Sequence, residues 1–268
     1  MTFVWIAFLV ALALVLFAVC RRRNKWKSPS GPFPEEWKQE LEGKVAFYAE
    51  LSAEEKRCFE HKVQEFLLNF RITGAETYLD DVDRLLAASS GVIPVFRFKD
   101  WQYGNLDEVV IYGDSFNRRF EAAQDGSKVE GLLGSGPMEG KMFLSRRALR
   151  EGFANERDKD NTAIHEFVHL IDKMDGSVDG IPEVLLERQY VIPWLDLIGR
   201  KIGEIEKGSS DINLYGATNR AEFLAVAGEY FFENPELLRE RHPDIHEALQ
   251  RVFGQGESTK GRSLLPGK

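Results

Sequence analysis

The sequence is poor in cysteine, since Cys20 and Cys58 are the only two among 268 residues. Two cysteines cannot build a framework of several disulfides, and Cys20 ends an apolar run, so we expect a reducing compartment. The sequence also lacks internal repeats and phosphate-binding loops. The glycine-rich residues 131–137 contain no lysine and precede no predicted helix, so they predict a hairpin turn instead.

Basic residues form no stripe that could follow a nucleic-acid backbone. The formal net charge is −8, although residues 21–27 contain five basic and no acidic residues and residues 1–20 carry no charged side chain. Without those five positive charges, residues 28–268 carry a net charge of −13. An acidic domain of this kind argues against direct nucleic-acid binding.

One long hydrophobic run is present, at residues 2–20. As a helix it would span about 28 Å, near the thickness of a bilayer core. The basic residues 21–27 follow it directly, whereas a secretory signal carries its positive charge in front. Residues 1–27 are therefore predicted to be a single transmembrane anchor in the inner or plasma membrane, with the following domain in the cytoplasm. A cleaved export signal and a purely cytoplasmic protein are the alternatives.

The rest of the chain predicts one main domain at residues 35–253, joined to the anchor by a linker at 28–34. Turn-forming residues dominate the linker, and the polar residues 254–268 predict a disordered tail. The pattern predicts an α+β fold, mostly helical, with a small mixed sheet. We expect helices at residues 35–44, 52–70, 75–88, 182–207 and 218–233, and strands at residues 91–98, 108–112, 128–133 and 140–145.

The run HEFVH at residues 165–169 is the strongest chemical signal in the chain. On a helix, His165 and His169 lie one turn apart on one face and can bind one ion, while Glu166 can reach a water held by that ion. They could also be ordinary helix residues. The surrounding residues are apolar almost all round the helix, however, so these three side chains are predicted to be buried. A bound metal ion is the simplest partner for their buried polar groups.

A catalytic zinc site needs a third protein ligand from elsewhere in the chain. Glu222 and Glu229 lie seven residues apart in an apolar helix, so they point the same way, and spacing alone allows either. An ion pair is the alternative role for each. Asp172 could orient a ligand histidine or pair with Lys173 at the helix end.

Two further histidines, His242 and His246, are also four residues apart. Pro243 between them suits a helix start, so we expect His242 at a helix cap and His246 on a polar surface rather than a second metal site.

Three runs resemble the Mlc titration factor A family of zinc peptidases: HEFVHLIDKMDGSVDGIP at residues 165–182, YGATNRAE at residues 215–222 and GEYFF at residues 228–232. Weaker similarity extends over residues 33–253. The resemblance implies a gluzincin-type site, in which the two HExxH histidines and a glutamate from a later helix hold one Zn²⁺ ion. Members are mostly soluble cytosolic proteins, so residues 1–27 fall outside it.

Carried over by position, the resemblance makes His165 and His169 zinc ligands and Glu166 the general base. It selects Glu222 over Glu229 as the third ligand, because the family places a tyrosine seven residues before that glutamate. This tyrosine is Tyr215, which would hydrogen bond the oxyanion formed during peptide hydrolysis.

These observations predict a zincin-like domain and a zinc-dependent metallopeptidase that acts on a peptide or protein substrate. Residues 140–145 are the candidate edge strand, to which a substrate would add as a further strand. One alternative is a protein that sequesters a transcriptional repressor, such as the Mlc repressor that the family implies. The other is a membrane-tethered quality-control protease.

Overall fold

The structure, a computed structural model, describes residue 5 and residues 26–116, 129–155 and 158–254. The helices, strands and short 3-10 helices (η) of these residues follow in this order: α2 Glu35–Lys44, α3 Ala46–Ala49, α4 Ala53–Asn69, β1 Arg71–Ala75, α5 Asp81–Val92, η1 Ile93–Val95, β2 Glu108–Tyr112, β3 Gly131–Leu133, η2 Gly136–Met138, β4 Lys141–Ser145, α6 Arg146–Ala154, α7 Thr162–Asp172, η3 Lys173–Asp175, η4 Arg188–Tyr190, α8 Val191–Glu206, η5 Leu214–Ala217, α9 Arg220–Glu233, α10 Pro235–Arg241 and α11 Pro243–Phe253. The predicted α+β class, mostly helical with a small mixed sheet, is confirmed.

The four strands form one mixed sheet in the order β1-β2-β4-β3. β1, β2 and β4 run parallel, with Ile72 opposite Val109 and Val109 opposite Met142. β3 runs antiparallel to β4 and forms the edge of the sheet, and the turn between them is the predicted hairpin. The prediction that residues 140–145 form the edge is wrong, because the shorter strand β3 pairs with them on that side.

A further prediction that the structure overturns is the strand at residues 91–98. Gly91 and Val92 end α5, and η1 follows directly with Pro94 in its first turn. These residues are buried, so their run of apolar side chains lacks the alternation that separates a half-buried strand from a helix end. The short strand β1 was not predicted, since it directly follows the predicted helix at residues 52–70.

The helix α4 is confirmed together with its start. Ser52 and Glu55 form a capping box, in which each side chain bonds the backbone N–H of the other residue. The helix predicted at residues 75–88 lies at α5, and the one predicted at 182–207 begins only at Val191. Turns and η4 fill the residues before it.

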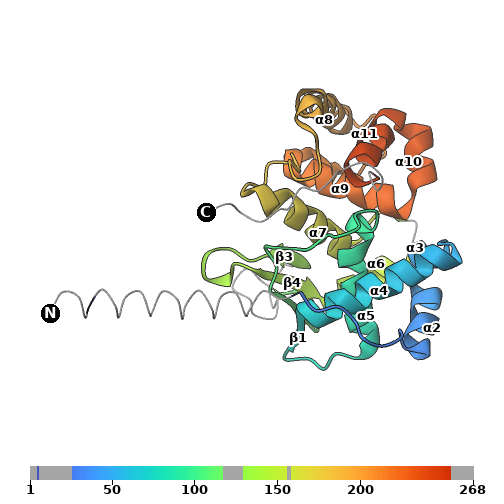
Figure 1. The fold of residues 1–268 in the computed structure, drawn as a ribbon. Coiled ribbons are helices and arrows are strands. Elements are labelled where there is room, and N and C mark those ends of the chain that lie inside the picture. Colours follow the sequence, from blue (N-terminus) through green and yellow to red (C-terminus); the bar gives the residue numbers. More distant parts are fainter. Residues whose placement is uncertain (1–4, 6–25, 117–128, 156–157, 255–268) are drawn as a thin grey trace.

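The helix α7 lies between two layers of the molecule (Figure 1). The sheet with α4 and α5 lies on one side of it, and α8 to α11 lie on the other. Phe167 is fully buried and its ring packs against Phe66 and Tyr103, with ring centroids 5.7 Å and 5.5 Å away. On the other side Gly228 of α9 faces Val168, and a Cβ there would lie 3.0 Å from a Val168 methyl group. This close approach fixes α9 against α7.

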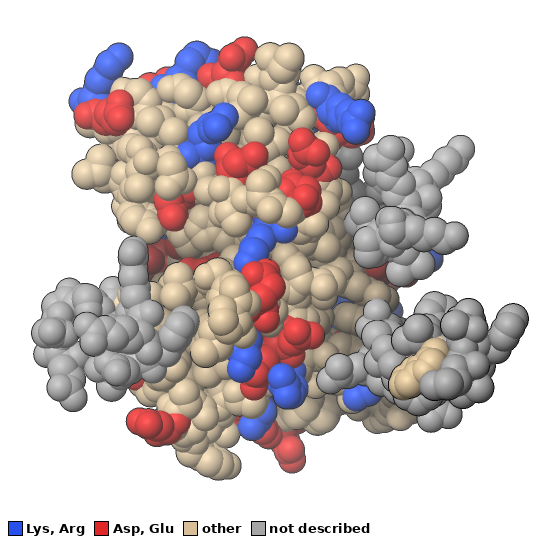
Figure 2. Space-filling model, turned by 90° about the vertical axis from the view of Figure 1, so that its left-hand side faces the viewer, with Lys and Arg blue, Asp and Glu red and all other residues tan. Residues whose placement is uncertain are grey.

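Of the predicted membrane anchor at residues 1–27, only Trp5, Trp26 and Lys27 are described, and of the predicted tail at residues 254–268 only Gly254 is described. Within the described part of the chain, no helix combines the length and the apolar character needed to cross a bilayer. On the face shown in Figure 2, Lys and Arg lie among Asp and Glu, and the described residues form no continuous basic patch there.

Candidate metal centre

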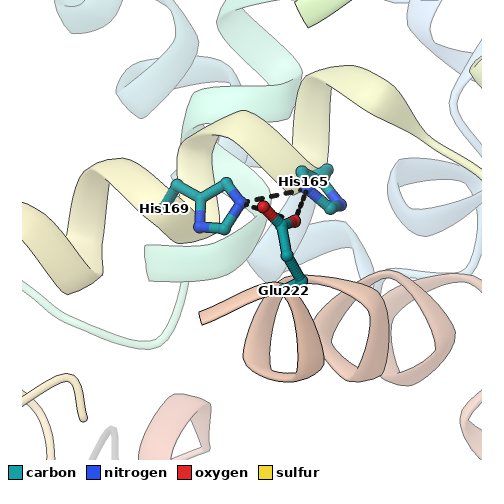
Figure 3. Close-up of side chains that lie close together, drawn as sticks. All are labelled: His165, His169 and Glu222. Carbon is teal, nitrogen blue, oxygen red and sulfur yellow. Dashed lines mark hydrogen bonds and ion pairs between the residues drawn. The ribbon is translucent and has the colours of Figure 1, made fainter. Parts of the chain in front are cut away.

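The helix α7 begins with a side-chain cap and buries most of its surface. The Asn161 carboxamide oxygen accepts a hydrogen bond of 3.1 Å from the backbone N–H of Ile164. Since apolar residues of α7 pack into both layers, the fold holds the helix on both sides and leaves His165 and His169 facing the start of α9 (Figure 3).

His165, His169 and Glu222 form one compact cluster (Figure 3). The Nε2 atoms of His165 and His169 are 3.0 Å apart, and Glu222 Oε2 lies 3.0 Å from the first and 3.2 Å from the second. These are the only His, Cys, Asp or Glu residues among those described that group as ligands of one metal ion. All three side chains are largely buried.

Glu222 reaches the cluster from the first turn of α9. Asn219 caps this helix by accepting a hydrogen bond of 3.0 Å from the backbone N–H of Glu222 itself. The residues that follow, from Phe223 to Tyr230, are buried against α7 and its neighbours. The sequence thus fixes both the start of α9 and the face that it turns to α7.

Glu229, the other candidate third ligand, lies behind His165 instead. Its Oε1 is 2.7 Å from His165 Nδ1, and its Oε2 accepts a hydrogen bond of 2.7 Å from the backbone N–H of Asn161. A carboxylate at Nδ1 holds the proton there and leaves the Nε2 lone pair directed at the cluster. Spacing in the sequence predicts that Glu229 lies on the same face of its helix as Glu222, but it does not predict the hydrogen bond to His165 Nδ1.

Asp172 makes no hydrogen bond to His169, whose buried Nδ1 has no hydrogen-bond partner among the described residues. Its Oδ2 accepts a hydrogen bond of 2.8 Å from the backbone N–H of Gly180, while its Oδ1 has no partner among the described residues. The alternative pair with Lys173 is also wrong, because Lys173 bonds Glu139 and the carbonyl of Gly134. Burial raises the pKa of Asp172 to about 6.

Glu166 lies on the side of α7 that faces the edge strand β3. A Cβ atom at Gly131 would lie 2.6 Å from Glu166 Cγ, 2.7 Å from its Oε1 and 2.7 Å from a methyl carbon of Thr162. Only glycine therefore leaves room for this glutamate beside the strand. The side chain is buried, and burial raises the pKa of Glu166 above its ordinary value.

The cluster favours positive charge. Burial opposes protonation of His165, but hydrogen bonds to Glu222 and Glu229 outweigh it and raise the pKa of His165 to about 10. Burial also opposes the charge on Glu222, yet its bonds to the two histidines hold the pKa of Glu222 well below its usual range. A site with this balance retains a cation, either a proton or a metal ion.

Tyr215 belongs to η5, directly before α9, and its ring centroid lies 6.0 Å from that of His165. The side chain is 53% exposed, so it lies at the open side of the cluster. The structure therefore brings to one region the five residues that the family resemblance assigns to the site, with Glu222 in the cluster and Glu166 and Tyr215 beside it.

The second pair of histidines binds no common partner. His242 occupies the N-cap position of α11, as predicted, but its side chain is buried and its Nε2 lies 2.7 Å from Asp211 Oδ1. His246 is half-buried and packs against Phe231. Asp211 also pairs with Lys159 and Arg241, so it ties the segment before α7 to the last two helices.

Comparison with protein families identifies the family of this chain. The sequence model of the family described as glucose-regulated metallo-peptidase M90 matches residues 19–254, which is most of the chain. The chain belongs to this family. The family is one of metallo-peptidases, so the likeness agrees with a cluster of two histidines and a glutamate on the two central helices.

Relatives of known name cover nearly the same length. The chain is 28% identical to an uncharacterised protein of Synechocystis over 83% of this chain and 84% of that protein. It is 26% identical to Mlc titration factor A of Pectobacterium atrosepticum over 79% and 83% of the two chains. It is 28% identical to Mlc titration factor A of Escherichia fergusonii over 86% and 90%. The family resemblance expected from the sequence is thus confirmed.

Proposed function

We propose that this chain is a zinc-dependent peptidase whose ion is held by His165, His169 and Glu222. The spacing of the three ligand atoms supports this proposal most directly. Tetrahedral ligands about 2.0–2.1 Å from zinc lie roughly 3.3 Å from one another. The three atoms here are separated by 3.0 to 3.2 Å, and two imidazoles with one carboxylate are a donor set that zinc prefers.

When bound, zinc supplies a Lewis acid that lowers the pKa of a water molecule and polarises a carbonyl group. The protein orients the ligands. Glu229 accepts a hydrogen bond from the Nδ1–H group of His165 and so favours the tautomer with a free Nε2. Glu229 also accepts a hydrogen bond from the backbone N–H of Asn161, the N-cap residue of α7. The same carboxylate therefore links the His165 side chain to the start of its own helix.

Glu166 is the proposed general base. It follows His165 on α7 and is confined between that helix and Gly131 of β3. Burial raises the pKa of Glu166, which makes its carboxylate a stronger base for taking a proton from the attacking water and passing it to the leaving amine. Tyr215 is the proposed donor of a hydrogen bond to the carbonyl oxygen of the substrate in the transition state.

The substrate is proposed to bind beside the edge strand β3 rather than beside β4. β3 is the strand next to α7, and its outer edge has no strand partner among the described residues. An extended peptide added there would pass Glu166, which contacts the same strand.

Hydrolysis by the full-length protein, loaded with zinc in detergent, tests this function. We expect an unstructured peptide mixture to be cleaved by the parent protein and not by Glu166→Gln, although both bind zinc. Mass spectrometry of the products identifies the cut bonds. If both proteins bind zinc and neither cleaves, hydrolysis is not the function of this site as isolated.

A second candidate function is binding of a transcriptional regulator, because two of the relatives are named Mlc titration factor A. The two functions separate at Glu166, which a binding protein does not need. Binding to a regulator should survive Glu166→Gln, whereas hydrolysis should not.

We further propose that residues 1–27 anchor the domain to the inner or plasma membrane, as their hydrophobic run and basic cluster suggest. The full-length protein should then sediment with membranes and resist extraction by salt. Release by salt alone would contradict an integral anchor.

A further inference from the structure

A groove of about 700 Å³ lies behind α7, outside the group of ligand residues. One wall comes from α3, the start of α4 and η1, and the other from the end of α9, the start of α10 and the end of α11 (Figure 1). Ile164 and Asn161, at the start of α7, also line it. The groove therefore lies between the two layers of the molecule, beside the start of α7.

Phenylalanine dominates the apolar part of the groove. Six such residues contribute to the lining: Phe47, Phe96, Phe153, Phe231, Phe232 and Phe253. Phe47, Phe231 and Phe232 are only partly buried, so their rings offer apolar surface that a bound side chain could cover. Aromatic surface of this kind binds aliphatic side chains and also the cationic groups of Lys and Arg.

The charges that remain free in the groove are all negative. Arg97 is the single basic residue of the lining, and its guanidinium bonds Glu55 at 2.9 Å. Glu50 and Glu236 are exposed, one on each wall, and neither makes an ion pair with another described residue. Glu233 also lines the groove, but burial raises its pKa to about 8, so it adds no free charge at neutral pH.

We propose that this groove binds a segment of another protein that carries apolar side chains flanked by Lys or Arg. The apolar side chains would cover the phenylalanines, and the basic ones would pair with Glu50 and Glu236. Because these acids stand on opposite walls, they favour an occupant with several separated cations over one small cation. The proposal does not depend on hydrolysis at the zinc cluster.

The position of the groove connects this partner to α7. Asn161 lines the groove, and its backbone N–H bonds Glu229, which in turn bonds His165. A segment in the groove therefore contacts the cap of the helix that carries the ligand cluster.

Peptide binding to the full-length protein tests the proposal. The probe is a fluorescein-labelled 16-residue amphipathic peptide of leucine and lysine, followed by fluorescence anisotropy at 150 mM salt. Two matched peptides replace all lysines by glutamate or all leucines by serine. We expect the leucine–lysine peptide to bind at least tenfold more tightly than either, because both the rings and the acids contribute.

Variants of exposed acids locate the binding site without altering the core. The double variant Glu50→Lys, Glu236→Lys should weaken binding at least tenfold. The control Glu206→Lys, an exposed acid on α8 outside the groove, should change it less than twofold.

Three results would overturn the proposal. The first is equal loss of binding in the control and the double variant. The second is binding that ignores the serine-for-leucine change and is displaced by the small cation spermine, since the groove would then hold a small cation. The third is dimerisation of the protein that Glu50→Lys, Glu236→Lys abolishes, which would make a second copy the occupant.

Discussion

Replacing Glu229 by glutamine should loosen the zinc site without touching any proposed ligand. Glu229 accepts two hydrogen bonds of 2.7 Å, one from His165 Nδ1 and one from the backbone N–H of Asn161, and it is only 4% exposed. A glutamine offers one carbonyl oxygen and one NH₂ group in the same space. Either His165 or Asn161 then faces a donor instead of an acceptor, so one buried bond is lost.

The size of the effect follows from that single loss. A lost bond to a charged, buried group costs about 1.5–3 kcal/mol, and carboxylates that orient metal-bound histidines contribute about 10- to 100-fold in affinity. We therefore expect the zinc dissociation constant of Glu229→Gln to rise by about 10- to 100-fold. Competition with a chromophoric chelator measures this constant without any substrate.

A matched control separates orientation from general loss of stability. Glu236→Gln changes an exposed glutamate on the neighbouring helix α10 and should leave zinc affinity unchanged. Circular dichroism checks that Glu229→Gln keeps its helices. Native helix content with an unchanged zinc constant in Glu229→Gln would refute the orienting role.

Three further predictions follow from single side chains. Gly131→Ala should lower kcat at least tenfold with little change in zinc affinity, because a Cβ there would displace Glu166. Steady-state kinetics measures kcat, and chelator competition measures the zinc affinity. Tyr215→Phe should lower kcat about 10- to 100-fold and leave KM nearly constant, if its hydroxyl acts only in the transition state; a change in KM alone would contradict this. Burial raises the pKa of Glu233 to about 8. The folded state therefore binds this proton more tightly than the unfolded state, and stability is lost as the pH rises from about 4.5 to about 8. Glu233→Gln carries no such proton, so its free energy of unfolding relative to the parent protein should increase by a few kcal/mol from pH 5 to pH 9. Denaturant unfolding at both pH values measures this difference. An equal difference at the two pH values would contradict the raised pKa of the buried carboxyl.

Local patterns predicted those parts of the fold that short-range chemistry decides. The N-cap residue Ser52 starts the helix predicted at residues 52–70, and the β-branched and aromatic residues of β2 favour the strand predicted at 108–112. The strand predicted at residues 91–98 failed for a physical reason. Its apolar side chains are buried in a helix end and a 3-10 turn, and composition alone cannot separate these two environments.

In the candidate site, too, short-range patterns predict some features and long-range packing decides the others. The spacing in HEFVH is enough to place His165 and His169 on one face, and the resemblance to a known family selected Glu222. The role of Glu229 depends on how α9 packs on α7, which Gly228 allows by its lack of a side chain. The place of Glu166 depends on which strand forms the edge of the sheet, and strand order is a long-range property that the local pattern of β3 and β4 does not contain.

The central claim is that His165, His169 and Glu222 hold one zinc ion, and metal content tests it most directly. Full-length protein purified with zinc and dialysed should retain one zinc per chain by elemental mass spectrometry, with nitrogen and oxygen neighbours near 2.0–2.1 Å in its X-ray absorption spectrum. The double variant His165→Ala, His169→Ala should retain none. Equal zinc in both proteins, or sulfur among the neighbours, would contradict the account.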